Sequence, residues 1–333
     1  MFSIKLAIKF GSGEISVYQK GVGVIAKEPA FLAVTGSGKN FKVKAIGKRA
    51  EKLIYSKTED LSVVQPIVNA QIVNVKMATL LFSEILHNLV QNRGFVSHIS
   101  ALVAVPCGLN YGQLRKIKKV IKASGISKIT FVSNAVCVRE MFDFEESEPI
   151  AVVDIGKNVT DITVLNDFEI YAGRTYFVGG VDMDKSISTF IQDNHNLEVL
   201  DITSEEIKNE ISSLYEKDTC TTKFIGIDTD NHFRKDDISA SEVTLAITSV
   251  YDSILNVCKY IIDSLDKNTS ARIYKNGIVF VGGASSIPGL FEYLNKKIEA
   301  NIIVPENPTD TVLLGASKLL SKDKEEGFPT IDF

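Results

Sequence analysis

The residues best suited to chemistry lie in one stretch, AVVDIGKNVTDITV, at positions 151–164. We expect a buried strand, a tight turn and a second strand there, because β-branched residues precede the turn and alternation resumes at Thr160. The turn carries Asp154, Gly156 and exposed backbone amides, and such amides can surround a phosphate. Ordinary hairpins also place Asp and Gly at their turns, so this stretch alone fits a purely structural turn equally well.

Two other glycine-rich turns have the same character. Gly11-Ser12-Gly13 joins alternating runs at 4–10 and 15–18, so each half of the chain opens with a similar hairpin. Gly-Ser-Gly is a common turn, and the pair of hairpins is therefore more informative than either one. Gly282-Gly283 follows a buried run and precedes a helix expected from Pro288, whose N-terminus would favour an anion.

The elements that position these turns alternate between strands and amphipathic helices, which predicts an α/β protein. Apolar residues recur at helical spacing in each expected helix. We expect helices at 76–91, 111–124, 183–195, 203–214, 241–265 and 309–320, and strands at 99–105, 126–132, 171–178 and 277–281.

The composition is that of an ordinary globular protein. The chain has 333 residues, 45% hydrophobic and 23% charged, which predicts a sizeable core divided between two domains. Its net charge of −4, with Lys and Arg spread along the chain, disfavours nucleic acid as a partner. The four cysteines form no CxxC pair, so we expect neither zinc nor disulfides, and a reducing cytoplasm fits best. We expect no signal peptide, and the apolar runs are too short to span a bilayer.

Taken together, these motifs resemble the actin-like ATPase superfamily, and within it bacterial MreB. The resemblance runs in one register from about Leu6 to Leu320, and it rests on the order and spacing of the motifs. The matching positions are Tyr18, Lys20-Gly21, Gly23, Glu28-Pro29, Ala104-Val105-Pro106, Gly108, Asp154-Ile155-Gly156, Glu205, Lys208, Ile278 to Gly283, Gly289-Leu290, Pro308-Thr309 and Gly315-Ala316.

The resemblance implies an actin-like fold of two similar α/β domains, or four subdomains, facing a nucleotide cleft. Domain I would span 1–143 with inserted subdomain IB at about 31–74. Domain II would span 144–317 with inserted subdomain IIB at about 185–240, and 318–333 would return to domain I. It also implies ATP or ADP as ligand, held by Lys9, Gly11, Ser12, Gly13, Asp154, Gly156, Lys157, Asn158, Gly180, Glu205, Lys208, Gly282, Gly283 and Ala284.

The departures from the family pattern concern catalysis. Lys9 stands where the family has an Asp near the metal, and Gln113 stands at the position of the catalytic Glu. The Gly-Gly-Thr of the second loop is Lys157-Asn158-Val159, and the third glycine of the adenosine motif is Ala284. Phosphoryl transfer depends on a metal and a positioned water. We therefore expect no metal site, doubtful Mg²⁺ binding and a degenerate ATPase rather than an enzyme. Two alternatives stay open: a Gln can still orient a water, and Lys9 could be a solvated residue of a shifted loop.

The leading functional hypothesis is a cytoplasmic, filament-forming cytoskeletal protein of the MreB type, acting in cell shape or organisation at the inner membrane face. Its partners would be itself, MreB paralogues and cell-shape membrane proteins. The alternatives are an active actin-like ATPase with an altered site and a non-polymerising, FtsA-like adaptor. Phe95 and Val96 match the place where some MreB proteins insert two apolar residues into lipid, and packing of Phe95 in the core is the alternative.

Overall fold

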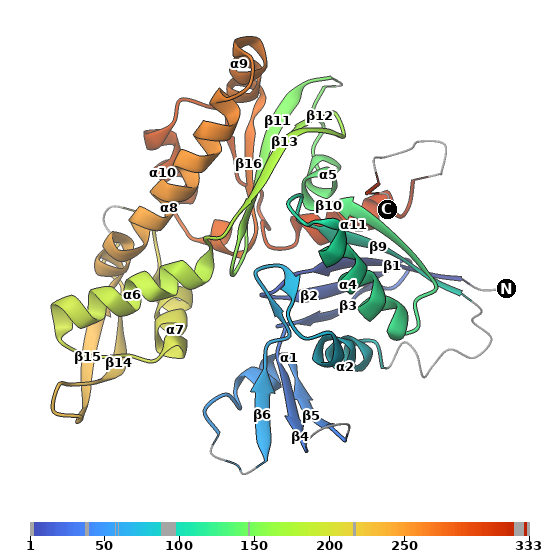
Figure 1. Ribbon diagram of the computed structural model, residues 1–333. Coiled ribbons are helices and arrows are strands. Elements are labelled where there is room, and N and C mark those ends of the chain that lie inside the picture. The colour runs from blue at the N-terminus through green and yellow to red at the C-terminus, as the bar shows by residue number, and fades with distance from the viewer. Residues whose placement is uncertain are drawn as a thin grey trace. The chain divides into compact units, whose positions relative to one another are not determined.

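The computed structural model describes residues 3–36, 40–56, 58, 60–87, 98–145, 147–215, 218–322 and 330–331. The chain forms two compact units, each around its own hydrophobic core (Figure 1). Unit 1 contains Met1–Phe144 and Asp310–Phe333, and unit 2 contains Glu145–Thr309. The chain therefore returns to unit 1 at Asp310, earlier than residue 318, because the final helix packs within unit 1.

The main sheet of unit 1 has the strand order β10-β9-β1-β2-β3. Strands β1, β2 and β3 form an antiparallel meander, and β9 and β10 run parallel to β1. The buried side chains of β1 and β9 include Leu6, Ile8 and Val103, so both strands contribute to the core. The strands are β1 (Ser3–Phe10), β2 (Ile15–Gln19), β3 (Gly23–Glu28), β9 (His98–Val105) and β10 (Lys128–Ser133).

Smaller strands and, among the described residues, five helices complete unit 1. A three-stranded sheet, β5-β4-β6, and a two-stranded ribbon, β7-β8, lie between β3 and α2 in the chain. The elements are β4 (Leu32–Thr35), β5 (Lys42–Ile46), α1 (Gly47–Glu51), β6 (Leu61–Val64), β7 (Ile67–Val68), β8 (Gln71–Ile72), α2 (Val75–Ile85), α4 (Tyr111–Ala123), α5 (Asn134–Arg139) and α11 (Thr311–Leu319).

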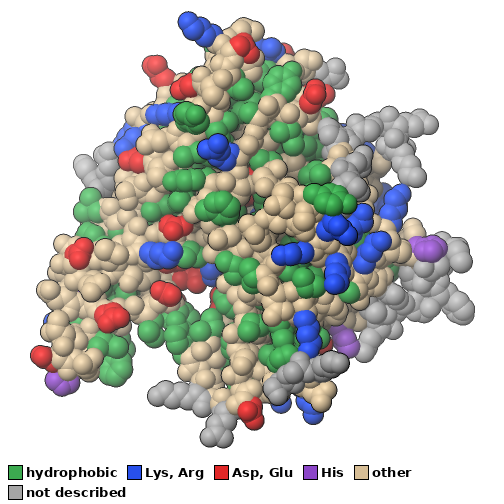
Figure 2. All heavy atoms as spheres, viewed as in Figure 1, with side chains coloured by type: hydrophobic (Ala, Val, Ile, Leu, Met, Phe, Trp, Pro, Cys, Tyr) green, Lys and Arg blue, Asp and Glu red, His purple; other side chains and the backbone are tan. Residues whose placement is uncertain are grey.

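Helix α4 is amphipathic. Leu114, Ile117, Val120 and Ile121 are buried in the core of unit 1. Its opposite side carries a run of Lys and Arg side chains, and Figure 2 shows these blue side chains gathered over the part of unit 1 that α4 covers. A charged side opposite an apolar stripe is typical of a surface helix.

The main sheet of unit 2 repeats the pattern of unit 1, with the strand order β13-β12-β11-β16-β17. Strands β11, β12 and β13 form an antiparallel meander, and β16 and β17 run parallel to β11. Every residue of β11 is buried, as expected for a central strand covered on both faces. The strands are β11 (Pro149–Ile155), β12 (Thr160–Asn166), β13 (Glu169–Tyr176), β16 (Ile278–Val281) and β17 (Ile302–Ile303).

Helices and one hairpin complete unit 2. Helix α8 is the one described helix with the length and hydropathy of a membrane span, and half of that stretch is buried inside the protein. Because its apolar stripe belongs to the hydrophobic core, we regard it as a core helix. The elements are α6 (Gly180–His195), α7 (Asp201–Ile211), β14 (Thr221–Ile227), β15 (Phe233–Ser239), α8 (Ala240–Asp263), α9 (Lys267–Asn276), η1 (Gly283–Ser286) and α10 (Leu290–Lys297).

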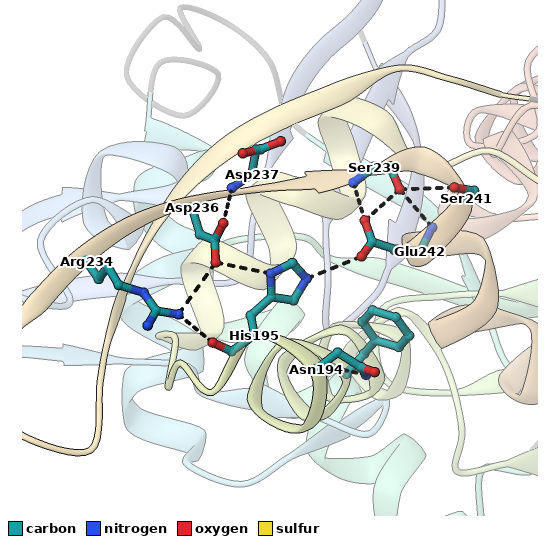
Figure 3. A network of polar contacts seen from close by, with 9 residues as sticks. Asn194, His195, Arg234, Asp236, Asp237, Ser239, Ser241 and Glu242 are labelled. Atoms are coloured by element: carbon teal, nitrogen blue, oxygen red, sulfur yellow. Dashed lines mark hydrogen bonds and ion pairs between the residues drawn. The ribbon is translucent and has the colours of Figure 1, made fainter.

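A polar network fixes the C-terminal end of α6 (Figure 3). His195 Nδ1 lies 3.2 Å from Asp236 on β15, and its Nε2 lies 3.4 Å from Glu242 on α8. Arg234 donates to the His195 carbonyl at 2.5 Å. Burial alone would raise the pKa of Asp236, but hydrogen bonds from the Asp237 amide and His195 outweigh burial and hold that pKa below its usual value. The network thus joins α6, β15 and α8.

Several helix bounds differ from the sequence predictions. The helix expected from Pro288 begins at Leu290, because Pro288 and Gly289 (φ +82°) form a turn before it, and the short helix η1 ends at Ser286. Helix α2 ends at Ile85, residues 88–91 of the helix expected at 76–91 lie outside the described residues, and α9 was not predicted. In α9 only Ser270 and Ile273 are buried, so its sequence carries little apolar periodicity.

Close packing between α11 and α5 generates a testable prediction. A Cβ on Gly315 would lie 1.8 Å from the backbone oxygen of Cys137, which cannot move without shifting α5. We expect Gly315→Ala to lower the free energy of unfolding by about 3 kcal/mol, as overpacking does, measured by urea unfolding. Gly112→Ala is the matched control, because its Cβ would meet only a side-chain atom at 3.4 Å. Equal stability of the two variants would contradict the prediction.

Candidate functional site

The turn between β11 and β12 lies against the first residues of α6. The Gly156 amide donates to the Val159 carbonyl at 2.9 Å and closes the turn. The Gly156 and Lys157 carbonyls accept hydrogen bonds from the amides of Gly180 (3.0 Å) and Val181 (2.8 Å). A Cβ on Gly179 would lie 2.6 Å from the Gly156 oxygen, so this approach requires glycine at 179. The turn and the helix start therefore form one rigid backbone unit.

Four charged side chains gather beside this turn, and we call them the charge quartet: Lys157, Asp184, Glu205 and Lys208. Lys157 Nζ contacts both carboxylate oxygens of Glu205, at 2.8 and 3.1 Å. Lys208 Nζ lies 2.6 Å from Asp184 Oδ1 and donates to the Gly180 carbonyl at 3.0 Å. The quartet links the turn, α6 and α7 through two ion pairs.

The two ion pairs differ in burial. The side chains of Lys208 and Asp184 are 12% and 8% exposed, whereas those of Lys157 and Glu205 are 20% and 30% exposed. Burial raises the pKa of Asp184, and the neighbouring Lys208 ammonium opposes this rise without cancelling it. The Lys208–Asp184 pair is thus a buried anchor, and the Lys157–Glu205 pair is accessible to solvent.

A second glycine turn, at 282–284, closes on the end of β11. Gly282 has φ +92°, and a Cβ there would lie 2.4 Å from the Ile155 oxygen and 2.6 Å from Asp154 Oδ1. Only glycine fits, so the turn brings the backbone directly against the buried Asp154. Ala284 offers its carbonyl to the Tyr251 hydroxyl at 2.6 Å, and a Cβ on Gly283 would meet no atom within 4 Å. Gly283 therefore faces open space.

In unit 1, the first glycine hairpin follows β1. Lys9 on β1 lies opposite Ser16 of β2 and Ala104 of β9. The Gly11 amide donates to the Glu14 carbonyl at 3.1 Å, and Gln65 donates to the Ser12 carbonyl at 3.0 Å. Gly13 completes this turn, which the Gln65 side chain ties to the segment after β6.

Gln113 forms a capping box at the start of α4. Its side-chain oxygen accepts a hydrogen bond from the Asn110 backbone amide at 2.7 Å, and its own backbone amide donates to Asn110 Oδ1 at 3.0 Å. A capping box satisfies amides that a helix start leaves without intrahelical partners. In this structure the Gln113 carboxamide oxygen therefore serves its own helix.

The structure brings together the predicted residues of unit 2 and adds two that the sequence analysis missed. Asp184 and Gly179 were not predicted as site residues, although Asp184 lies between the buried Met183 and Ile187 of an amphipathic helix, a position where an acidic residue is unusual. Phe95 and Val96 lie outside the described residues. The predicted residues gathered in unit 2 are Asp154, Gly156, Lys157, Asn158, Gly180, Glu205, Lys208, Gly282, Gly283 and Ala284.

Several features of these unit 2 residues suit an anion. These residues offer two ammonium groups, the start of α6 and glycine turns that permit close backbone approach. Within the described residues, the one cluster with three potential metal ligands, Asp228, Asp230 and His232, lies elsewhere, on the turn between β14 and β15. The amides of Asp230 and His232 donate to Asp228 Oδ1, which accounts for that cluster as an ordinary surface turn.

The buried anchor generates a prediction about stability and pH. Lys208→Met would leave the Asp184 carboxylate without its counterion, and we expect a loss of about 3 kcal/mol in the free energy of unfolding at neutral pH. The folded-state pKa of Asp184, already raised, would rise further. As pH falls through that pKa, Asp184 becomes neutral and needs no counterion, so the loss should shrink in acid.

Urea unfolding at several pH values measures this loss, and Lys223→Met on the exposed side of β14 is the matched control. The double variant Lys208→Met with Asp184→Asn should recover part of the stability. A loss that does not change with pH would contradict a role for Asp184.

Comparisons with known proteins agree on one family. The family model described as MreB/Mbl protein matches residues 3–327. The chain is 23% identical over 325 residues to the cell shape-determining protein Mbl of Bacillus subtilis (strain 168), covering 96% of each chain. It is 22% identical over 330 residues to the cell shape-determining protein MreB of Escherichia coli (strain K12), covering 96% of this chain and 94% of that protein.

Solved structures show the same fold. The structure of MreB 5 of Spiroplasma citri bound to AMPPNP has a TM-score of 0.88 at 21% identity, over 98% of this chain and 100% of that chain. The MamK double helical filament has a TM-score of 0.79 at 18% identity, over 96% of this chain and 99% of that chain. The actin-like fold predicted from the sequence is confirmed, and the chain belongs to the MreB/Mbl family.

Proposed function

We propose that this protein is an MreB-type cytoskeletal protein that assembles into filaments and acts in determining cell shape. The observation that carries the proposal is the family match over residues 3–327, which includes both units. The relatives MreB and Mbl are named as cell shape-determining proteins, and the similar MamK structure is that of a filament. We place the protein in the cytoplasm, with itself, MreB paralogues and cell-shape membrane proteins as partners.

ATP or ADP is the proposed ligand of the candidate site. Two similar structures of MreB5 of Spiroplasma citri were solved with AMPPNP and with ADP. In this chain the glycine turns at 156 and 282 and the open space at Gly283 fit the close backbone approach that a nucleotide needs. Lys157, Asn158, Gly180, Lys208 and Gly282 would hold it in unit 2, and the hairpin with Lys9, Gly11, Ser12 and Gly13 would supply the other phosphate loop.

We propose weak or absent hydrolysis. Lys9 brings a positive charge where the family places a carboxylate, and the carboxamide oxygen of Gln113 already accepts the Asn110 amide. A lysine cannot be a ligand of Mg²⁺ while it is protonated, and Mg²⁺ prefers oxygen donors. The residues present therefore fit the nucleotide better than they fit its metal, and we derive no catalytic step through Mg²⁺.

Sedimentation tests the assembly proposal. The full chain, alone and mixed with an MreB paralogue, is centrifuged with ATP, with ADP and without nucleotide, and the pellets are viewed by negative-stain electron microscopy. We expect filaments in at least one condition, with little release of phosphate from ATP. A chain that stays monomeric in every condition would overturn the proposal, and fast phosphate release would favour an active ATPase instead.

Liposome pelleting tests the proposed membrane contact through Phe95 and Val96. Two apolar side chains contribute only a few kcal/mol when they are buried in lipid, so binding should depend on the avidity of a filament. We expect Phe95→Ser to reduce pelleting of preassembled protein with vesicles. The exposed Phe233→Ser, on β15, is the control for a general loss of apolar surface. Pelleting that is the same for wild type and Phe95→Ser would refute the contact.

A further inference from the structure

The Lys157–Glu205 pair joins a turn to a helix through side chains alone. The Lys157 side chain extends from the turn whose carbonyls bind the start of α6, and its ammonium reaches both oxygens of Glu205 on α7. A carboxylate that accepts two contacts from one ammonium presents two oxygens much as a phosphate does. Glu205 therefore offers Lys157 the kind of contact that a phosphate would offer.

The neighbouring pair shows what a fixed contact looks like in the same quartet. Lys208 contacts both Asp184 and the Gly180 carbonyl, and the side chains of Lys208 and Asp184 are 12% and 8% exposed. The side chains of Lys157 and Glu205 are 20% and 30% exposed, each more than its counterpart in the Lys208–Asp184 pair. Water and solutes can reach the Lys157–Glu205 pair, so it can exchange partners without opening the core.

Charge makes this exchange competitive. The quartet contains two ammonium groups and two carboxylates, so its formal charges balance without a ligand. An incoming polyphosphate would be attracted by Lys157 and repelled by Glu205. The same ammonium cannot satisfy both anions fully, because it has three donors and Glu205 already engages it through two oxygens.

We propose that Glu205 is an internal substitute for a ligand phosphate, and that a nucleotide polyphosphate binds by taking the Lys157 ammonium from it. This inference rests on the proposed nucleotide function and adds its regulation. The ion pair holds the Lys157 ammonium in place when no ligand is bound and sets a threshold for binding. Lys157 then supplies part of the positive charge that the phosphates need in the absence of a metal.

Calorimetry on the full chain tests this exchange, with ATP and with inorganic tripolyphosphate, both in excess chelator. Glu205→Gln keeps the shape and the hydrogen-bonding atoms but removes the competing charge, so we expect about tenfold tighter binding of both probes. Lys157→Met should weaken both by about tenfold or more. The matched controls are Glu206→Gln, the exposed neighbour on α7, and Lys223→Met on β14, which should bind as the wild type does.

Three results would overturn the proposal. These are unchanged or weaker binding of both probes by Glu205→Gln, a gain for ATP without a gain for tripolyphosphate, and no binding of either probe by wild type or Glu205→Gln. Thermal unfolding followed by circular dichroism checks that each variant folds. The charge-swapped double variant, Lys157→Glu with Glu205→Lys, keeps an ion pair and should lose tripolyphosphate binding even though it folds.

Sedimentation separates this inference from the proposed function. If the protein forms filaments but Glu205→Gln does not change binding, the cytoskeletal function is supported and the exchange is refuted. If the protein never assembles but the Glu205→Gln variant binds tripolyphosphate more tightly, the exchange is supported and the filament proposal is refuted.

Discussion

The backbone hydrogen bonds between the turn after β11 and the start of α6 are the constraint on which the unit 2 site depends. The carbonyls of Gly156 and Lys157 accept the Gly180 and Val181 amides, and glycine at 179 lets the two segments approach. This contact uses helix amides that have no intrahelical partner. It also sets where the Lys157 side chain begins, and hence which groups it can reach.

The lysine in this turn changes the chemistry of the site without changing its backbone. A long aliphatic stem carries the ammonium from the turn to Glu205, and the buried Lys208–Asp184 pair holds α7 and α6 in register beside it. Breaking the buried pair by removing one partner would leave an uncompensated charge, whereas the exposed pair is screened by water. One cluster thus contains both a structural anchor and an exchangeable contact.

The two units repeat one sheet design. Each has an antiparallel meander followed by two parallel strands, and each meander begins with a hairpin that carries glycine at its turn. The fold persists at about one-fifth sequence identity to its relatives. Burial requires apolar residues at the strand and helix positions, but it does not specify which ones.

The sequence by itself determined the elements whose signal is local. The strand–turn–strand at 151–164 was predicted from its β-branched residues and its turn, and every residue of its first strand is buried. The helices α4 and α8 were predicted from periodicity, because each buries a regular apolar stripe. The order of the motifs was enough to predict the family. In contrast, α9 has too few buried residues to produce such a pattern, and only the packing of the whole unit shows where it lies.

Only the tertiary structure decided what the charged residues contact. Lys157 and Glu205 belong to different elements, and their ion pair exists because α7 packs beside the turn. Asp184 stands at an unusual position for an acidic residue, and only the structure shows that Lys208 lies next to it in the interior. Gln113 matches a catalytic position in sequence, yet its side chain caps α4. Ion pairs and caps depend on distances of a few ångströms between elements, and residue order does not specify these distances.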